Sequence, residues 1–115
     1  MNVNTRACVV YIAAGMCGLS KVTSLYDHAE NRPLNVSGTV SAEAIDVYDF
    51  DRSCHVSGSL KNLYDYGNKA HIHITFTGDK FSGYDYASKF HFTGSVEDGM
   101  VQLYDYETEM YYRYS

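Results

Sequence analysis

A Tyr-Asp-aromatic tripeptide recurs along most of this chain, and the repeat constrains the fold more than any other feature of the sequence. Clear copies begin at Tyr48, Tyr64, Tyr84 and Tyr104, and a weaker copy, Tyr-Asp-His, begins at Tyr26. A run that alternates apolar and polar residues follows each copy, and a period of two is typical of a β-strand with one buried face. The repeats therefore predict a succession of similar β-hairpins.

Composition supports an all-β fold in a single domain. The chain has 115 residues, which suits one domain with a real core, spanning 1–115 with an apolar segment at 1–23 and a hairpin meander at 24–115. Twelve tyrosines and no tryptophan are present. Tyrosine is favoured on half-buried pleated surfaces, where its ring packs and its hydroxyl reaches water, so this excess fits a sheet better than a helical bundle.

The first apolar stretch, residues 7–19, is too short to span a membrane, which takes roughly 20 residues as a helix. Val9 to Ile12 favour a strand, whereas the alanines around them favour a helix, so periodicity does not decide between the two. We expect a helical or mixed segment packed against the sheet. A signal peptide over 6–15 is the alternative, and it would make the protein secreted or periplasmic.

Charge and cysteine content exclude several classes of partner. The formal net charge is −5 and the nine Lys and Arg residues are scattered, so no nucleic-acid partner is expected. Cys8, Cys17 and Cys54 show neither a CxxC pair nor a finger spacing, which indicates either a reducing compartment or plain core packing. We therefore expect a cytoplasmic protein without cofactor or metal, in which Cys54 is buried and unpaired.

From residue 24 onward, apolar residues collect at even positions, which predicts a buried even face. These positions carry Tyr26, Leu34, Val36, Val40, Tyr48, Phe50, Cys54, Val56, Leu60, Tyr64, Tyr66, Ile72, Ile74, Phe76, Tyr84, Tyr86, Phe90, Phe92, Val96, Tyr104, Tyr106, Met110, Tyr112 and Tyr114. An apolar band also precedes each Tyr-Asp pair at odd positions and needs a cover, for which the N-terminal segment is one candidate. The remaining odd positions are polar and can face water.

The buried residues stay at even positions across a turn only if the loop has an odd number of residues. This predicts three-residue turns at 51–53, 67–69, 87–89 and 107–109. The result is an antiparallel up-and-down meander of about ten strands. We expect it to form a closed or nearly closed small barrel, because closure removes exposed strand edges.

The spacing Asp-x5-His occurs three times, and a three-residue turn would place each aspartate directly across from its histidine. Opposed Cβ atoms lie about 4.5–5.5 Å apart, close enough for a carboxylate–imidazole hydrogen bond. Such a dyad beside a serine resembles part of a hydrolase triad, but no copy is marked out by a pocket or an oxyanion hole, so a structural pair is favoured. The pairs are Asp49/His55, Asp65/His71 and Asp85/His91.

His71 and His73 lie on the same side of one strand, roughly 6.6 Å apart by strand rise. Two imidazoles bind a metal only where a third ligand converges, and the sequence offers no obvious one, so an exposed polar face is the simpler interpretation.

No phosphate-binding loop, dinucleotide fingerprint or zincin motif is present, so enzymatic activity has no positive support. We expect a non-catalytic protein that binds a protein partner through a surface rich in tyrosine, aspartate and histidine. The alternative is a barrel that encloses a small apolar or aromatic ligand, and a hydrolase with an Asp–His dyad is a remote third. The candidate binding residues are Tyr64, Tyr66, Tyr84, Tyr86, Tyr104, Tyr106, Asp49, Asp65, Asp85, His55, His71, His73 and His91.

Overall fold

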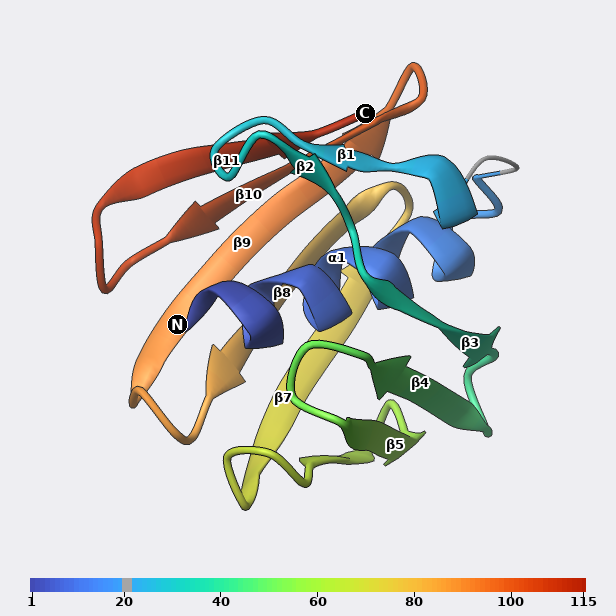
Figure 1. Ribbon diagram of the computed structural model, residues 1–115, viewed down its shortest axis with the longest axis vertical. Helices are drawn as coiled ribbons and strands as arrows, with labels where there is room; N and C mark the ends of the chain where they lie inside the picture. The colour runs from blue at the N-terminus through green and yellow to red at the C-terminus, as the bar shows by residue number, and fades with distance from the viewer. Residues whose placement is uncertain (20–21) are drawn as a thin grey trace.

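A computed structural model describes residues 1–19 and 22–115, and it confirms an all-β meander with one N-terminal helix (Figure 1). The helix is α1 (Val3–Met16), and a short 3-10 turn, η1 (Val22–Ser24), leads into the sheet. The strands are β1 (Tyr26–Asp27), β2 (Arg32–Pro33), β3 (Val36–Val40), β4 (Ile45–Asp49), β5 (Cys54–Ser59), β6 (Asn62–Asp65), β7 (Ala70–Thr77), β8 (Lys80–Asp85), β9 (Phe90–Glu97), β10 (Met100–Asp105) and β11 (Met110–Tyr114).

All eleven strands belong to one antiparallel sheet, in the order β2-β1-β11-β10-β9-β8-β7-β6-β5-β4-β3. The first strand pairs with the last, since Asp27 lies opposite Tyr114. The two edge strands, β2 and β3, follow each other in the chain, with residues 34–35 between them, but they do not pair. The sheet is therefore strongly curled and open, so the expectation of full closure into a barrel is wrong (Figure 1).

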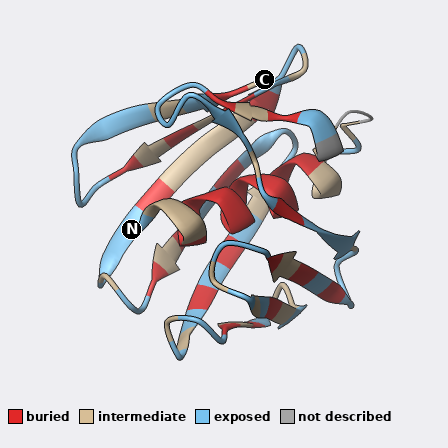
Figure 2. Cartoon of the chain, in the orientation of Figure 1, coloured by how far each residue is buried: buried red, intermediate tan, exposed pale blue. Residues whose placement is uncertain are grey.

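Helix α1 lies within the curl of the sheet, and every residue from Thr5 to Ala14 is buried (Figure 2). A helix that is apolar all round suits a position with protein on every side. The Asn2 side chain caps its first turn by accepting from Thr5 N at 2.7 Å. Gly18, with φ 72°, follows the last turn in the left-handed conformation common after helices. Helical structure is thus confirmed for the N-terminal segment.

No helix within residues 1–19 and 22–115 combines the length and the apolar character needed to cross a membrane. The cysteines at 8, 17 and 54 are free thiols, and Cys54 is half-buried rather than buried.

The prediction of three-residue turns is wrong, because the loops after the Tyr-Asp pairs contain four residues. Strand partners flank each loop as Asp49 with Cys54, Asp65 with Ala70, Asp85 with Phe90 and Asp105 with Met110. The loops at the opposite end of β5 to β10 contain two residues, for example Gly78 and Asp79 between Thr77 and Lys80. Even loop lengths move the inward-facing side chains from odd to even positions at every turn.

The single buried even face is therefore also wrong, because inward parity alternates from strand to strand. On β7, Ile72 and Ile74 point inward and are buried at even positions, whereas on β8 the buried residues are at odd positions, Phe81, Gly83 and Asp85. The apolar band at odd positions does face the core, where α1 covers it, as the N-terminal segment was expected to do. The band comprises Leu25, Ile45, Val47, Leu63, Phe81, Val101 and Leu103.

Candidate functional site

Five aspartates build the loops at one end of the sheet, and we call Asp27, Asp49, Asp65, Asp85 and Asp105 the inner aspartates. All five are buried. In each, Oδ1 accepts from a backbone N–H two residues on, at 2.9 to 3.1 Å. Such a side-chain cap folds the chain back locally, as aspartate does in Asx turns. The last loop residue then adopts positive φ, as at Asn31, Ser53, Lys69, Lys89 and Glu109.

Arg52 joins two of these loops electrostatically. Its Nε donates to Asp49 Oδ2 at 2.5 Å, and its Nη1 donates to Asp65 Oδ2 at 3.1 Å. Burial alone would lower the pKa of this guanidinium, but the hydrogen bonds and attraction from the two carboxylates raise it above its usual value. Thr5 Oγ1, in the first turns of α1, also donates to Asp65 Oδ2 at 3.0 Å. The loops are thereby tied to the helix.

The predicted Asp–His pairs are wrong. Asp49, Asp65 and Asp85 face the interior, one residue away from the positions that oppose the histidines. Each histidine instead lies across from the tyrosine that precedes the aspartate, because the loop is one residue longer than expected. The observed pairs are Tyr48–His55, Tyr64–His71 and Tyr84–His91.

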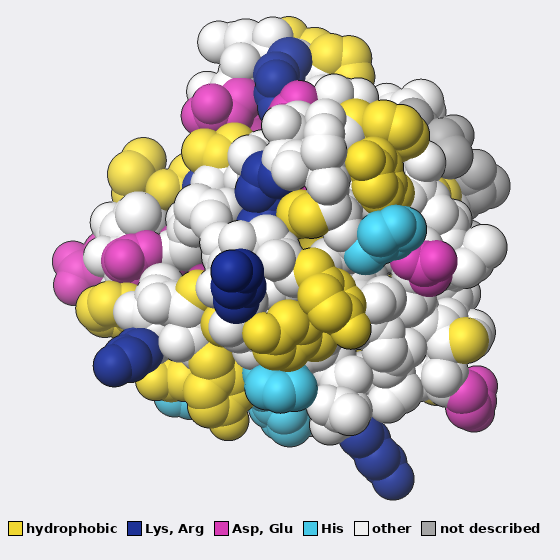
Figure 3. Space-filling view, turned by 60° about the horizontal axis from the view of Figure 1, so that its bottom comes forward, with side chains coloured by type: hydrophobic (Ala, Val, Ile, Leu, Met, Phe, Trp, Pro, Cys, Tyr) yellow, Lys and Arg dark blue, Asp and Glu magenta, His cyan; other side chains and the backbone are white. Residues whose placement is uncertain are grey.

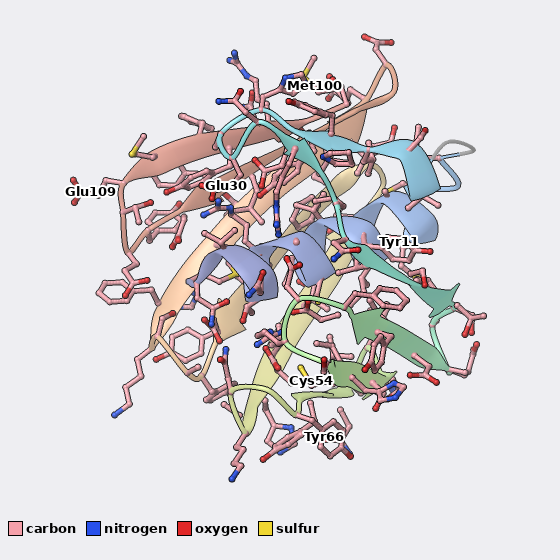
Figure 4. The ribbon with its side chains drawn as sticks, viewed as in Figure 1. Tyr11, Glu30, Cys54, Tyr66, Met100 and Glu109 are labelled. Atoms are coloured by element: carbon pink, nitrogen blue, oxygen red, sulfur yellow. The ribbon has the colours of Figure 1, made fainter. Side chains whose placement is uncertain are left out.

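The tyrosines and the aromatic residues that follow the aspartates lie on the outer face of the sheet, and we call this set the outer aromatic belt. Figure 4 shows the side chain of Tyr66 directed away from α1. Within each repeat the two rings pack edge to face, with centroids 4.8 to 4.9 Å apart. The belt comprises Tyr48, Phe50, Tyr64, Tyr66, Tyr84, Tyr86, Tyr104 and Tyr106.

The first ring of each belt pair is half-buried and the second is exposed. Relative exposures are 53% for Phe50, 57% for Tyr66, 54% for Tyr86 and 48% for Tyr106. Four large rings thus project into solvent from equivalent positions on alternate hairpins. Soluble proteins rarely expose many large apolar groups together unless the surface binds something.

The histidines extend the belt along the return strands. The rings of His55, His71 and His91 pack against the tyrosine opposite, with centroids 4.8 to 4.9 Å apart. His73 lies opposite Tyr84 from the other side, so this tyrosine has a histidine on each neighbouring strand. Among the described residues, no three His, Cys, Asp or Glu side chains are grouped so as to hold a metal ion.

Two open grooves run between neighbouring belt pairs. The first has a volume of about 480 Å³ and lies between Tyr64 and Tyr86, with His71, His73 and Lys69 in its lining. The second has a volume of about 520 Å³ and lies between Tyr84 and Tyr106; its lining includes His73, His91, Lys89 and Phe90. The structure therefore brings the predicted tyrosines and histidines together on one surface and leaves the predicted aspartates out.

The interior offers little space, because α1 occupies the curl of the sheet. A small hollow beside the helix, lined by Val3, Ala7 and Val36 among others, has a volume of about 10 Å³. A ligand pocket usually measures several hundred Å³.

Sequence reasoning missed Arg52 and Thr5 as partners of the inner aspartates, and it missed Lys69 and Lys89 in the grooves. The aspartates did carry a signal in the sequence, since each directly follows a tyrosine in every copy of the repeat. No family model, curated protein or solved structure matches this chain. Its function is accordingly argued from the geometry above.

Proposed function

We propose that this protein is a non-catalytic binding protein that engages a protein partner through the outer aromatic belt. The observation that carries the proposal is the exposure of Phe50, Tyr66, Tyr86 and Tyr106 at equivalent positions of alternate hairpins. Tyrosine is enriched where proteins bind one another, because it supplies a large contact area with little side-chain entropy to lose. The half-buried rings behind these residues hold them in place, which lowers that entropy cost further.

The shape of the surface favours a macromolecular partner over a small ligand. Both grooves are open to solvent along the outer face, whereas small molecules usually bind in pockets that bury most of their surface. An extended peptide segment can cross successive strands and contact several belt pairs at once. The interior alternative has weaker support, because α1 fills the space that a ligand would need.

Charge points to an acidic segment on the partner. The charged side chains that line the first groove are Lys61 and Lys69, and that of the second is Lys89, with histidines in both and no Asp or Glu among the described lining residues. Figure 3 shows side chains of Lys or Arg and of His among hydrophobic side chains on one face, with several acidic side chains toward its margins and one against a histidine. A locally basic surface on a chain of net charge −5 attracts carboxylates selectively.

Affinity capture with mass spectrometry tests the proposal when it compares matched variants. The wild-type protein, a Tyr66→Ser/Tyr86→Ser/Tyr106→Ser variant and a Met100→Ser control are each immobilised and exposed to a lysate of the source organism. Met100 is also an exposed hydrophobic residue, but it lies outside both grooves. We expect at least one protein to be retained by wild type and control and lost from the triple variant.

Binding of the purified partner then tests the charge argument. Lys69→Glu/Lys89→Glu should weaken binding at least tenfold and reduce its dependence on salt. Arg113→Glu, a charge reversal on β11, should change affinity less than threefold. Recovery of the same proteins by the triple variant would disprove a binding role for the belt, and equal effects of the charge reversals would disprove the acidic-segment assignment.

A further inference from the structure

Asp85 carries a buried carboxylate oxygen without a hydrogen-bond partner. The residue is 1% exposed, and its Oδ1 accepts from Ala87 N at 3.1 Å, which leaves Oδ2 unpaired. Ser88 Oγ, three residues on in the same loop, is also buried and unpaired. An unpaired buried charge costs considerable stability, so a protein retains one mainly where another group satisfies it part of the time.

Equivalent aspartates of the neighbouring loops show what such an oxygen binds in this fold. Oδ2 of Asp65 accepts from the Arg52 guanidinium and from Thr5 Oγ1. Oδ2 of Asp49 accepts from Arg52 Nε. Oδ2 of Asp105 lies 3.0 Å from the Met1 nitrogen. In each of these three aspartates a nitrogen cation lies beside Oδ2, whereas Asp85 Oδ2 has no such partner.

A hollow of about 390 Å³ adjoins Asp85 and is large enough for such a group. Its lining is mixed polar and apolar and includes Met1, Asn2, Asn68, Ser88 and Glu107. The Glu107 carboxylate, 40% exposed at its side chain, also lines the hollow and is already paired with the Met1 nitrogen. The hollow therefore combines a buried anion, further oxygen acceptors and access from solvent.

We propose that this hollow binds a guanidinium group. The planar guanidinium carries several donors in a fixed fork, so one group can donate to both Asp85 Oδ2 and Ser88 Oγ once a small movement of the loop uncovers these two buried atoms. The neighbouring pair of Arg52 and Asp65 provides the same chemistry within the chain. A calcium ion fits less well, since it requires six to eight oxygen ligands and Asp85 Oδ1 is already engaged by the loop backbone.

This site is separate from the outer aromatic belt, since it lies beside the N-terminal end of α1 and contains none of the belt residues. Its existence does not depend on the proposed function.

Thermal unfolding of matched variants tests whether the Asp85 charge is unpaired in the free protein. Asp85→Asn keeps the Oδ1 cap but removes the charge, so we expect an unchanged or raised Tm. Asp65→Asn makes the same change where the charge has partners, and it should lower Tm by several degrees. A clear fall in Tm for Asp85→Asn would overturn the proposal, because it would show that the free protein already satisfies this carboxylate.

Binding is tested by following the backbone amide NMR signals of Ala87 and Ser88. The probes are an N-acetylated, C-amidated Gly-Arg-Gly peptide, agmatine, n-butylammonium and calcium chloride. We expect the two guanidinium probes to bind with Kd on the order of 1 mM. Asp85→Asn should weaken binding at least tenfold, and Asp98→Asn, an equal charge change in a distant exposed loop, should leave it unaltered.

The four probes distinguish the possible occupants of the hollow from the outcomes that would disprove the proposal. Tighter binding of the peptide would identify an arginine of another protein as the occupant, and tighter binding of agmatine would identify a small guanidine. Equal binding of n-butylammonium, a response to calcium alone, or no response to any probe would each overturn the guanidinium assignment. Shifts that persist in Asp85→Asn would do the same.

Discussion

Arg52 and Asp65 form an ion pair between two successive hairpin loops, with Arg52 Nη1 3.1 Å from Asp65 Oδ2. The Arg52 side chain is 15% exposed and that of Asp65 is 1% exposed, so the pair is largely removed from water. Asp49 accepts from the same guanidinium. One arginine thus neutralises two buried carboxylates and holds the loops in register against α1.

We predict that Arg52→Ala destabilises the protein by about 3–5 kcal/mol, because it leaves two buried carboxylates without their cation. The free energy of unfolding, measured by chemical denaturation, provides the check. In an Asp49→Asn/Asp65→Asn background, Arg52→Ala should lower the free energy of unfolding much less, since no buried carboxylate then loses its cation. Arg113→Ala, at an exposed position on β11, should stay within about 0.5 kcal/mol. Equal losses in both backgrounds would show that the arginine acts through packing alone.

Substitutions of Phe92 and Tyr64 distinguish the observed strand register from the predicted one, in which all even positions are buried. Phe92 is fully buried, so Phe92→Ala should cost about 3–5 kcal/mol. Tyr64 is half-buried on the outer face, so Tyr64→Ala should cost only about 1 kcal/mol, and His73→Ala should remain within about 0.5 kcal/mol. Denaturation of the three variants gives the ranking. Comparable losses for Phe92 and Tyr64 would mean that both rings belong to the core.

The sequence pattern was sufficient to predict the strands, their sequential order and the N-terminal element beneath the sheet. Periodicity reports alternation within a strand, and Ile72 and Ile74 alternate as expected. It does not report loop length, which here depends on a hydrogen bond that the backbone N–H two residues on donates to an aspartate oxygen, as Gly67 N does to Asp65 Oδ1. One extra loop residue exchanges the inward-facing and outward-facing side chains of the next strand. The hydropathy pattern alone does not reveal that residue.

Only part of the candidate site was predicted, because a hydropathy pattern does not report the contacts that the folded loops make. Tyr66 and Tyr86 count as apolar in a hydropathy pattern, yet their rings tolerate exposure, so they were assigned to the core face and also to a binding surface. Asp49 and Asp65 were expected on the binding surface, opposite His55 and His71, because a three-residue turn was assumed. Their burial depends on Arg52 and on backbone N–H groups, which are contacts that only the folded loop brings together.

Gly94 provides a test of packing between β8, β9 and β10. A Cβ atom added at Gly94 would lie 2.2 Å from the Phe81 ring and 2.4 Å from the Gln102 backbone oxygen. We predict that Gly94→Ala destabilises the protein by about 1–3 kcal/mol through overpacking. Thr93→Ala, at the neighbouring half-buried position on the same strand, is the control and should cost less than about 1 kcal/mol.

Replacing the ring should relieve only part of that clash, because the carbonyl oxygen cannot move without the strand. Gly94→Ala combined with Phe81→Leu should therefore be less destabilising than the sum of the two single changes, yet remain below wild type. Strict additivity of the unfolding free energies would show that the Phe81 ring does not occupy the space left by Gly94.

Tyr114 should make stability fall in alkaline solution. The residue is fully buried on β11, and Arg6 Nε donates to its hydroxyl oxygen at 2.6 Å. Burial raises the pKa of the Tyr114 hydroxyl well above its usual value of about 10, and attraction to the Arg6 charge opposes that rise only in part. The folded protein therefore keeps this proton at a pH where the unfolded chain has lost it.

The sign follows from proton linkage. A raised folded-state pKa contributes stability that is fully present below the unfolded pKa of about 10 and is lost as pH rises toward the folded value, with a limiting slope of about 1.4 kcal/mol per pH unit. Tyr114→Phe removes this titration. It also leaves Arg6 Nε without its acceptor, at a cost of about 1–3 kcal/mol that does not vary with pH because arginine stays protonated. Denaturation of both proteins at several values above pH 9 should therefore show unfolding free energies that converge as pH rises. Curves that stay parallel would mean that Tyr114 titrates alike in the folded and unfolded chains, and that its hydroxyl is reached by solvent.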